Sequence, residues 1–175
     1  DYRGYGFSGG SPTKENLLTD SCKVFEHIKD NLIARGFNGK KIIMGRSLGS
    51  ASVWEIAENS SKSFDACIIE SGFATETTLL PLLGVTADEI KFTLSDGFQN
   101  LRKIKKFTKP LLIIHAKNDH IVPLSEGKLA YKSVLSKNKK IIVADQADHN
   151  NIIYCMGKKY FKTIRSFIDS IWLKK

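Results

Sequence analysis

Four short, almost continuously apolar runs constrain the fold of this sequence more than any other feature. They lie at residues 41–44, 65–70, 110–115 and 140–143, and longer stretches separate them. Strands that are apolar on both sides and alternate with helices are typical of a parallel sheet that helices cover on both faces. The sequence therefore predicts an α/β fold with a doubly wound, mostly parallel sheet.

The intervening stretches carry apolar residues at helical spacing. In the first of them Leu18, Cys22 and Phe25 share one helical face, and Gly36 ends the pattern. The predicted helices cover residues 14–35, 49–58, 124–136 and 155–173. Ligands of such folds bind beyond the carboxyl ends of the strands, so functional residues are expected in the loops at that edge.

Residues 74–100 break this rhythm, with several leucines around Pro81 and Gly84. We expect them to form a short helical lid or cap inserted over the carboxyl edge of the sheet. The chain opens on a glycine-rich loop without a methionine or a signal pattern. We therefore expect residues 1–175 to be a single domain that is incomplete at its N-terminus.

The composition is that of a globular domain, with 42% hydrophobic and 26% charged residues in a chain of 175. No apolar run is long enough to span a membrane, so no integral membrane segment is expected. The net charge is +9, but the lysines are spread in short clusters. This pattern is typical of a solvated surface, and no nucleic-acid partner is expected.

Three cysteines, Cys22, Cys67 and Cys155, lie far apart and form no Cys-x-x-Cys pair. A zinc site is therefore not expected, and Cys67 is predicted to be a small buried residue of a strand. The pattern suits a reducing compartment and predicts a cytoplasmic protein; any targeting signal would lie upstream of this sequence.

Gly45-Arg46-Ser47-Leu48-Gly49 follows the first predicted strand directly and opens a predicted helix. Gly-x-Ser-x-Gly is a weak signal by itself, but strand, sharp turn and helix are the setting of a nucleophile elbow. We expect Gly45 and Gly49, on either side of Ser47, to be required, because side chains at these positions would clash in the strained turn. Ser47 is then predicted to present its hydroxyl at the carboxyl edge of the sheet, above a helix N-terminus that favours negative charge.

A serine nucleophile needs a base, and His149 is the preferred candidate. It follows the fourth predicted strand and so lies at the same edge as Ser47. His115, at the end of the third strand, is the rival, although it can equally be a core residue. His27 is predicted to be a surface or structural residue of the first helix, and His120 is predicted to border the site.

The base needs an orienting carboxylate, and Asp119 in the loop after the third strand is the preferred candidate. The order serine, aspartate, histidine is the one expected for this type of elbow. Glu70, at the end of the second strand, is the rival acid. Asp148 is a weaker rival because it is adjacent to His149 in sequence and cannot easily reach the far side of the imidazole.

Four segments together resemble α/β-hydrolase domain proteins, in particular the serine-aminopeptidase-like, prolyl-oligopeptidase-related branch of uncharacterised bacterial hydrolases. They span almost the whole chain and are residues 1–8, 45–49, 114–123 and 148–150. The resemblance implies the C-terminal part of an α/β-hydrolase fold. In that family the first segment follows the fourth strand of an eight-stranded sheet, so the first four strands would lie upstream.

The resemblance also implies the remaining parts of the site. The backbone N–H of Leu48 would be one oxyanion-hole donor, and a loop upstream of this chain would supply the second. The first strand of this chain would be left as an unpaired edge. Neither a metal nor an organic cofactor is needed. We expect the intact protein to be active and the isolated segment to be inactive.

Substrate contacts are less defined by the sequence. Phe73, Leu79 and Leu83 are expected either to line an acyl pocket or to pack the cap onto the domain. Arg46 occupies the variable position of the elbow and is a candidate substrate contact. Arg3 either meets an acidic substrate group or, as we prefer, makes a structural hydrogen bond.

Together these features predict a serine hydrolase that cleaves an ester, a thioester or a related acyl bond of a small-molecule substrate through an acyl-enzyme. Nothing in these residues demands an amide substrate, so a serine aminopeptidase is an alternative. A catalytically inactive binding protein of the same fold is the other alternative.

Overall fold

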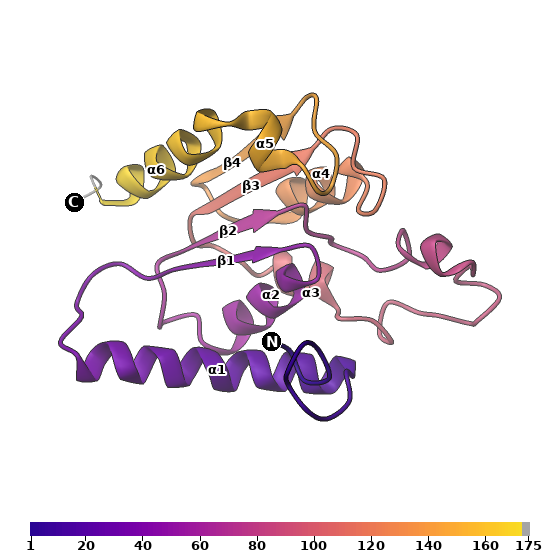
Figure 1. Ribbon diagram of the computed structural model, residues 1–175, viewed down its shortest axis with the longest axis horizontal. Helices are drawn as coiled ribbons and strands as arrows, with labels where there is room; N and C mark the ends of the chain where they lie inside the picture. Colours follow the sequence, from indigo (N-terminus) through magenta and orange to yellow (C-terminus); the bar gives the residue numbers. More distant parts are fainter. Residues whose placement is uncertain (173–175) are drawn as a thin grey trace.

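Four parallel strands form the central sheet of the computed structural model, which describes residues 1–172, in the order β1-β2-β3-β4 (Figure 1). The strands are β1 (Ile42–Arg46), β2 (Ala66–Glu70), β3 (Leu111–Ala116) and β4 (Lys139–Ala144). All four predicted strands are confirmed, and β1 runs on through Gly45 to Arg46. Between β1 and β2 the register begins with Ile42 opposite Ala66. Between β3 and β4 it begins with Leu111 opposite Lys139.

Both faces of the sheet are covered, as predicted. Every residue of β2 and β3 is buried. Because successive side chains point to opposite faces, Ile69 and Ile113 pack towards α2, α3 and α4, whereas Ile68 and Ile114 pack towards α5 and α6. The predicted α/β class with a parallel sheet is therefore confirmed.

The helices follow the predicted pattern with three differences. They are α1 (Lys14–Ala34), α2 (Gly49–Asn59), α3 (Asn100–Ile104), α4 (Leu124–Ser133), α5 (Ile152–Met156) and α6 (Lys158–Trp172). The first difference is that the short helix α3 was not predicted. The prediction of one helix over 155–173 is wrong, because Gly157 has φ 51° and separates α5 from α6; residue 173 lies outside the described part. The helix predicted over 124–136 ends at Ser133, because Val134 is extended.

The segment that leads from β2 to α3 projects away from the sheet (Figure 1). Its regular structure is one turn of 3-10 helix, η1 (Leu80–Leu83), which ends at Gly84 in the left-handed region, φ 72°. The base of the segment is anchored by Glu126 of α4, whose buried carboxylate accepts hydrogen bonds from the Ala74 and Thr75 amides at 2.8 and 2.7 Å. The expected insertion is thus less helical than its leucines indicated.

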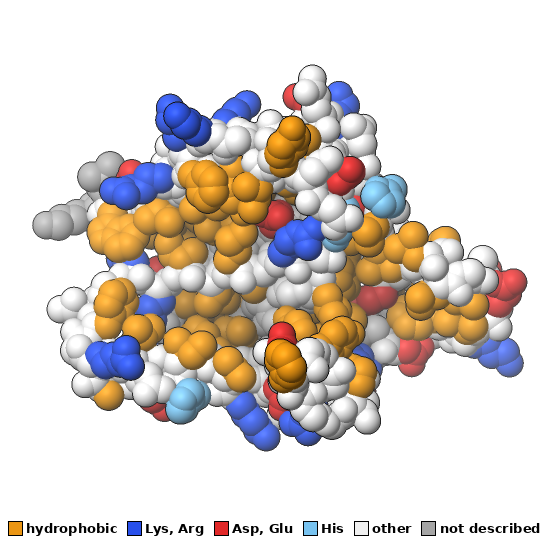
Figure 2. Space-filling view, in the orientation of Figure 1, with side chains coloured by type: hydrophobic (Ala, Val, Ile, Leu, Met, Phe, Trp, Pro, Cys, Tyr) orange, Lys and Arg blue, Asp and Glu red, His pale blue; other side chains and the backbone are white. Residues whose placement is uncertain are grey.

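Among the described residues β1 pairs only with β2. A groove of about 990 Å³ runs along its outer edge towards α1, and Val24, Ile28, Ile43 and Met44 contribute to its apolar lining (Figure 2). The expectation that this strand forms an open edge of the sheet therefore holds for the described chain.

Candidate active site

Ser47 occupies a sharp turn between β1 and α2. Its φ is 52°, a left-handed conformation that non-glycine residues rarely adopt, and its amide donates a hydrogen bond of 2.9 Å to the Glu70 carbonyl. A Cβ added to Gly45 would lie 2.3 Å from the Gly49 carbonyl oxygen, so only glycine fits there. The same does not hold for Gly49, where the nearest atom to an added Cβ is the Tyr2 hydroxyl at 3.6 Å. The expectation that both glycines are sterically required is therefore wrong for Gly49.

This difference predicts opposite effects for two alanine substitutions. Gly45→Ala is expected to destabilise the protein by about 3 kcal/mol, because backbone atoms of the elbow must move. Gly49→Ala, at the first position of α2, is the matched control and is expected to leave stability unchanged or raise it by up to about 1 kcal/mol. Urea unfolding of the full-length protein measures both. Equal stability of the two variants would contradict the assignment.

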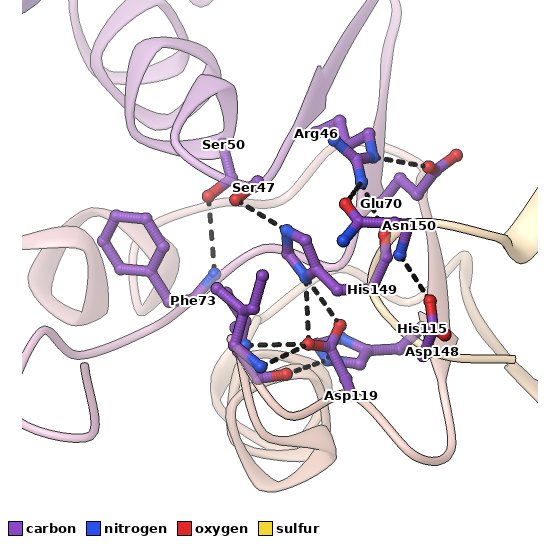
Figure 3. Close-up of polar contacts among 12 residues, drawn as sticks. Arg46, Ser47, Ser50, Glu70, Phe73, His115, Asp119, Asp148, His149 and Asn150 are labelled. Carbon is purple, nitrogen blue, oxygen red and sulfur yellow. Dashed lines mark hydrogen bonds and ion pairs between the residues drawn. The ribbon is translucent and has the colours of Figure 1, made fainter. Parts of the chain in front are cut away.

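His149 connects Ser47 to Asp119 (Figure 3). Its Nε2 lies 3.0 Å from Ser47 Oγ, and its Nδ1 lies 2.9 Å from both carboxylate oxygens of Asp119. The three residues come from the loops after β4, β1 and β3, which end at one edge of the sheet. His149 and Asp119 are 4% and 8% exposed, so this chain of polar contacts is largely shielded from water.

Asp119 is held as a charged acceptor. Its Oδ1 also accepts the Ile121 and Val122 amides at 3.1 and 2.8 Å. Burial by itself raises the pKa of Asp119, but the Val122 amide and His149 outweigh it, so the pKa lies below its usual value. A carboxylate only accepts, so His149 Nδ1 donates to it and Nε2 is left to accept the Ser47 proton.

The rival histidines lie elsewhere. His115 is completely buried, and its Nε2 donates to the Val122 carbonyl at 2.9 Å. Burial lowers the pKa of His115, which keeps it neutral behind the Asp119 loop. His27 and His120 are exposed. Of the four histidines, His149 alone contacts Ser47 within the described chain.

The rival acids are engaged with other groups. Asp148 binds within its own loop, where its carboxylate accepts the Asn150 amide and the Asn151 side chain. Glu70 contacts Arg46 and the Tyr160 hydroxyl. Neither carboxylate contacts the His149 imidazole, so the arrangement brings together the serine, histidine and aspartate that the sequence singled out.

A cavity lies next to the elbow, on the side of Leu48. It has a volume of about 210 Å³; Leu17, Leu48 and Phe98 form apolar parts of its walls, and mostly polar residues of the N-terminal loop and of the start of α1 form the rest. The Leu48 backbone N–H lies at the start of α2, where the first amides of a helix have no intrahelical acceptor. Leu17 and Phe98 were missed by sequence reasoning, because α1 and the end of the projecting segment meet here only in the folded chain.

The residues proposed as substrate contacts are placed differently from one another. Phe73 is 2% exposed and belongs to a buried cluster with Leu17 of α1 and Val122, and Leu79 packs against this cluster, so both join the projecting segment to the domain. Leu83 is 76% exposed, at the end of η1. The guanidinium of Arg46 contacts Glu70 and the His149 loop (Figure 3). Their roles towards a substrate stay predictions.

The N-terminal loop is tied to the domain by side chains. Arg3 forms two hydrogen bonds with the Asp20 carboxylate, at 2.9 and 2.6 Å. The Tyr2 hydroxyl contacts Ser52 Oγ at 2.8 Å. Arg3 thus has the structural partner that we preferred for it.

Three further findings on the described residues concern metal-ligand groups, membrane-spanning helices and the burial of Cys67. No three His, Cys, Asp or Glu side chains within residues 1–172 are grouped as a metal site would require. No described helix is both long enough and apolar enough to cross a bilayer. Cys67 is completely buried, as predicted for a strand residue.

Comparisons with known proteins identify the family and agree with the fold. A family model described as the prolyl oligopeptidase family matches residues 3–171. Human protein ABHD12B is 30% identical over 192 aligned residues, which cover 98% of this chain and 52% of that protein. A monoacylglycerol lipase from Paleococcus ferrophilus superposes with a TM-score of 0.72 at 17% identity, over 98% of this chain and 82% of the other. An acylaminoacyl peptidase from Pyrococcus horikoshii gives a TM-score of 0.75 at 19% identity, over 93% of this chain and 30% of the other. The chain spans about half the length of the curated relatives it matches.

Proposed function

The chain belongs to the prolyl oligopeptidase family of α/β-hydrolases, and from this premise we propose that it carries the catalytic centre of a serine hydrolase. Ser47 is the nucleophile, His149 the general base and Asp119 the residue that orients the imidazole. The observation that carries the proposal is the continuous contact from Ser47 Oγ through the His149 ring to Asp119, at 3.0 and 2.9 Å.

The proposed reaction proceeds in two halves. His149 Nε2 accepts the Ser47 proton while Oγ attacks a carbonyl carbon, and the Leu48 N–H stabilises the oxyanion. The protonated imidazole then gives its proton to the leaving group, and an acyl-Ser47 ester remains. Water, deprotonated by His149, attacks this ester, and the carboxylic acid leaves as Ser47 recovers its proton. A second oxyanion donor, expected outside this chain, stays a prediction for the full-length protein.

The proposed substrates are small carboxylic esters, thioesters or related acyl compounds. The cavity beside Leu48 supports this class, because its apolar walls suit an acyl group and Leu48 is adjacent to Ser47 in the elbow. A serine aminopeptidase is the second candidate, and the similarity to an acylaminoacyl peptidase favours it. We also propose that residues 74–100 form a lid over this edge. Cytoplasmic location and the lack of a nucleic-acid partner stay predictions.

A fluorophosphonate probe tests the proposed function directly on the full-length protein. We expect one covalent adduct, which peptide mapping places on Ser47 and which prior heating of the protein prevents. Ser50 and Ser71 are the nearby serines, and both are buried. No adduct on folded protein would favour the inactive binding protein, and an adduct on another serine would overturn the choice of nucleophile.

A panel of substrates separates the two candidate reactions. Nitrophenyl esters of increasing acyl length and aminoacyl nitroanilides are compared at equal enzyme concentration. Faster turnover of the esters supports the acyl hydrolase, whereas turnover of the nitroanilides alone supports the aminopeptidase.

A further inference from the structure

A buried carboxylate that the proposed reaction does not use lies beside the site. Glu70 ends β2, and its side chain is 3% exposed. Its Oε1 lies 3.2 Å from Arg46 Nε, and its Oε2 accepts the Tyr160 hydroxyl of α6 at 2.5 Å. A carboxylate this deeply buried is stable only when it is paired and hydrogen-bonded, so Glu70 fixes both partners.

The other end of Arg46 reaches the loop that carries the candidate base. Arg46 Nη2 donates to the His149 carbonyl at 2.5 Å and to Asn150 Oδ1 at 3.2 Å (Figure 3). The planar guanidinium therefore spans two groups at once, Glu70 on one side and the His149 backbone on the other. The side chain is 44% exposed, so its role depends on this directed geometry more than on charge alone.

Glu70 is also joined to the nucleophile. Its backbone carbonyl accepts the Ser47 amide at 2.9 Å. A single residue thus contacts the backbone of the nucleophile directly and the backbone of the base through Arg46. Glu70 therefore links the backbone segment that carries Ser47 to the one that carries His149. This link helps to fix the distance between Ser47 Oγ and His149 Nε2.

Tyr160 of α6 completes the arrangement from the face of the sheet to which the Glu70 side chain points. Its ring is buried, and burial together with the hydrogen bond to Glu70 raises the pKa of its hydroxyl well above the usual value. Tyr160 therefore remains a protonated donor to Glu70 at any working pH. With Tyr160 on one oxygen and Arg46 on the other, the carboxylate has little freedom to rotate.

We propose that Arg46 is a positioning residue, oriented by Glu70 and Tyr160, that holds the His149 loop at proton-transfer distance from Ser47. The inference rests on the proposed function of that triad and goes beyond it, since the side chains of Arg46 and Glu70 bind one another and backbone or neighbouring groups rather than the three triad side chains. A misplacement of the base by about 1 Å costs on the order of 100-fold in rate, so a loop released from Arg46 loses turnover.

Steady-state kinetics of the full-length protein on a nitrophenyl ester test the proposal. Arg46→Met keeps an unbranched apolar stem but removes the guanidinium. It is expected to lower kcat by about 10- to 100-fold and to change KM by no more than about twofold. Arg46→Lys, which offers a single donor group, is expected to recover part of kcat.

Two further variants separate positioning from general damage. Arg165→Met is the matched control, because Arg165 also pairs with a carboxylate, Asp169, but on the exposed face of α6; its kcat should equal that of the wild type. Combining Arg46→Met with Glu70→Gln should cost little more than Arg46→Met alone, because both changes release the same loop. Tyr160→Phe, which removes one hydroxyl, is expected to lower kcat about threefold and replaces Arg46→Met if that variant does not fold.

The results distinguish failure of the positioning role from failure of the proposed function. If the wild-type protein forms no fluorophosphonate adduct at Ser47, the proposed function fails. If it does, and Arg46→Met reacts with probe and ester as fast as the wild type, only the positioning role fails. A raised KM with unchanged kcat would instead make Arg46 a substrate contact. Fully independent losses in the Arg46–Glu70 double variant would also overturn the proposal.

Discussion

Replacing Ser47 by alanine is expected to lower kcat by about 10⁶-fold, to the level of the uncatalysed background plus binding effects. The reason is that the Oγ 3.0 Å from His149 Nε2 is the protein atom that bonds to the substrate carbon in the proposed reaction. Rates of ester hydrolysis by purified full-length protein, at enzyme concentrations high enough to detect residual turnover, measure the loss.

The chain offers a close control for this substitution. Ser50 lies one helical turn further on, is completely buried, and accepts the Phe73 amide through its Oγ at 3.4 Å. Ser50→Ala removes an equal hydroxyl without touching His149, and should leave kcat within about threefold of the wild type. Adding His149→Ala to Ser47→Ala should cause no further loss, because the two residues act as one unit. A Ser47→Ala enzyme that keeps a tenth of its activity would place the chemistry elsewhere.

Replacing Asp119 by asparagine is expected to lower kcat by about 10⁴-fold, although the side chain keeps its size. The amide can still accept the Ile121 and Val122 N–H groups that now reach Oδ1 at 3.1 and 2.8 Å. Its NH₂ group then faces His149 Nδ1 and must donate to it. The imidazole proton moves to Nε2, which can no longer accept the proton of Ser47.

Asp148→Asn is the matched control for this tautomer effect. Asp148 is one residue from His149, but its carboxylate serves the Asn150 amide and the Asn151 side chain. Its replacement should lower kcat only a few-fold, through looser positioning of the loop. If Asp148→Asn caused the larger loss, Asp119 would not be the orienting acid. Circular dichroism of both variants checks that the losses do not come from unfolding.

Local patterns in the sequence were enough to predict the sheet and the long helices α1 and α2. The strands of Ile68–Ile69 and Leu111–Ile114 are apolar at every position because both of their faces are buried, and this signal is readable without tertiary contacts. The elbow is equally local, since Gly45 and the positive φ of Ser47 are properties of five consecutive residues. The chain order and the shared strand edge then indicated which serine, aspartate and histidine would meet.

Other features follow from no local pattern. The break at Gly157 was missed because the apolar spacing continues across it. Glycine allows its φ of 51°, but the presence of a glycine does not by itself predict that conformation. Gly49 looked as constrained as Gly45, yet the space around it depends on Tyr2, which is distant in sequence.

The direction of a polar side chain was the least predictable quantity. From the sequence, Glu70 is only the rival to Asp119 as orienting acid, and Arg46 is a candidate substrate contact. In the folded protein the two form an ion pair, Glu70 also binds Tyr160, 90 positions later, and Arg46 also binds the His149 carbonyl, 103 positions later. Burial and backbone conformation are encoded in neighbouring residues, so the sequence determined the sheet, the elbow and the edge where the site forms. Only the tertiary structure decided which charges are paired there, because the energy of a buried ion depends on partners that the fold brings from elsewhere in the chain.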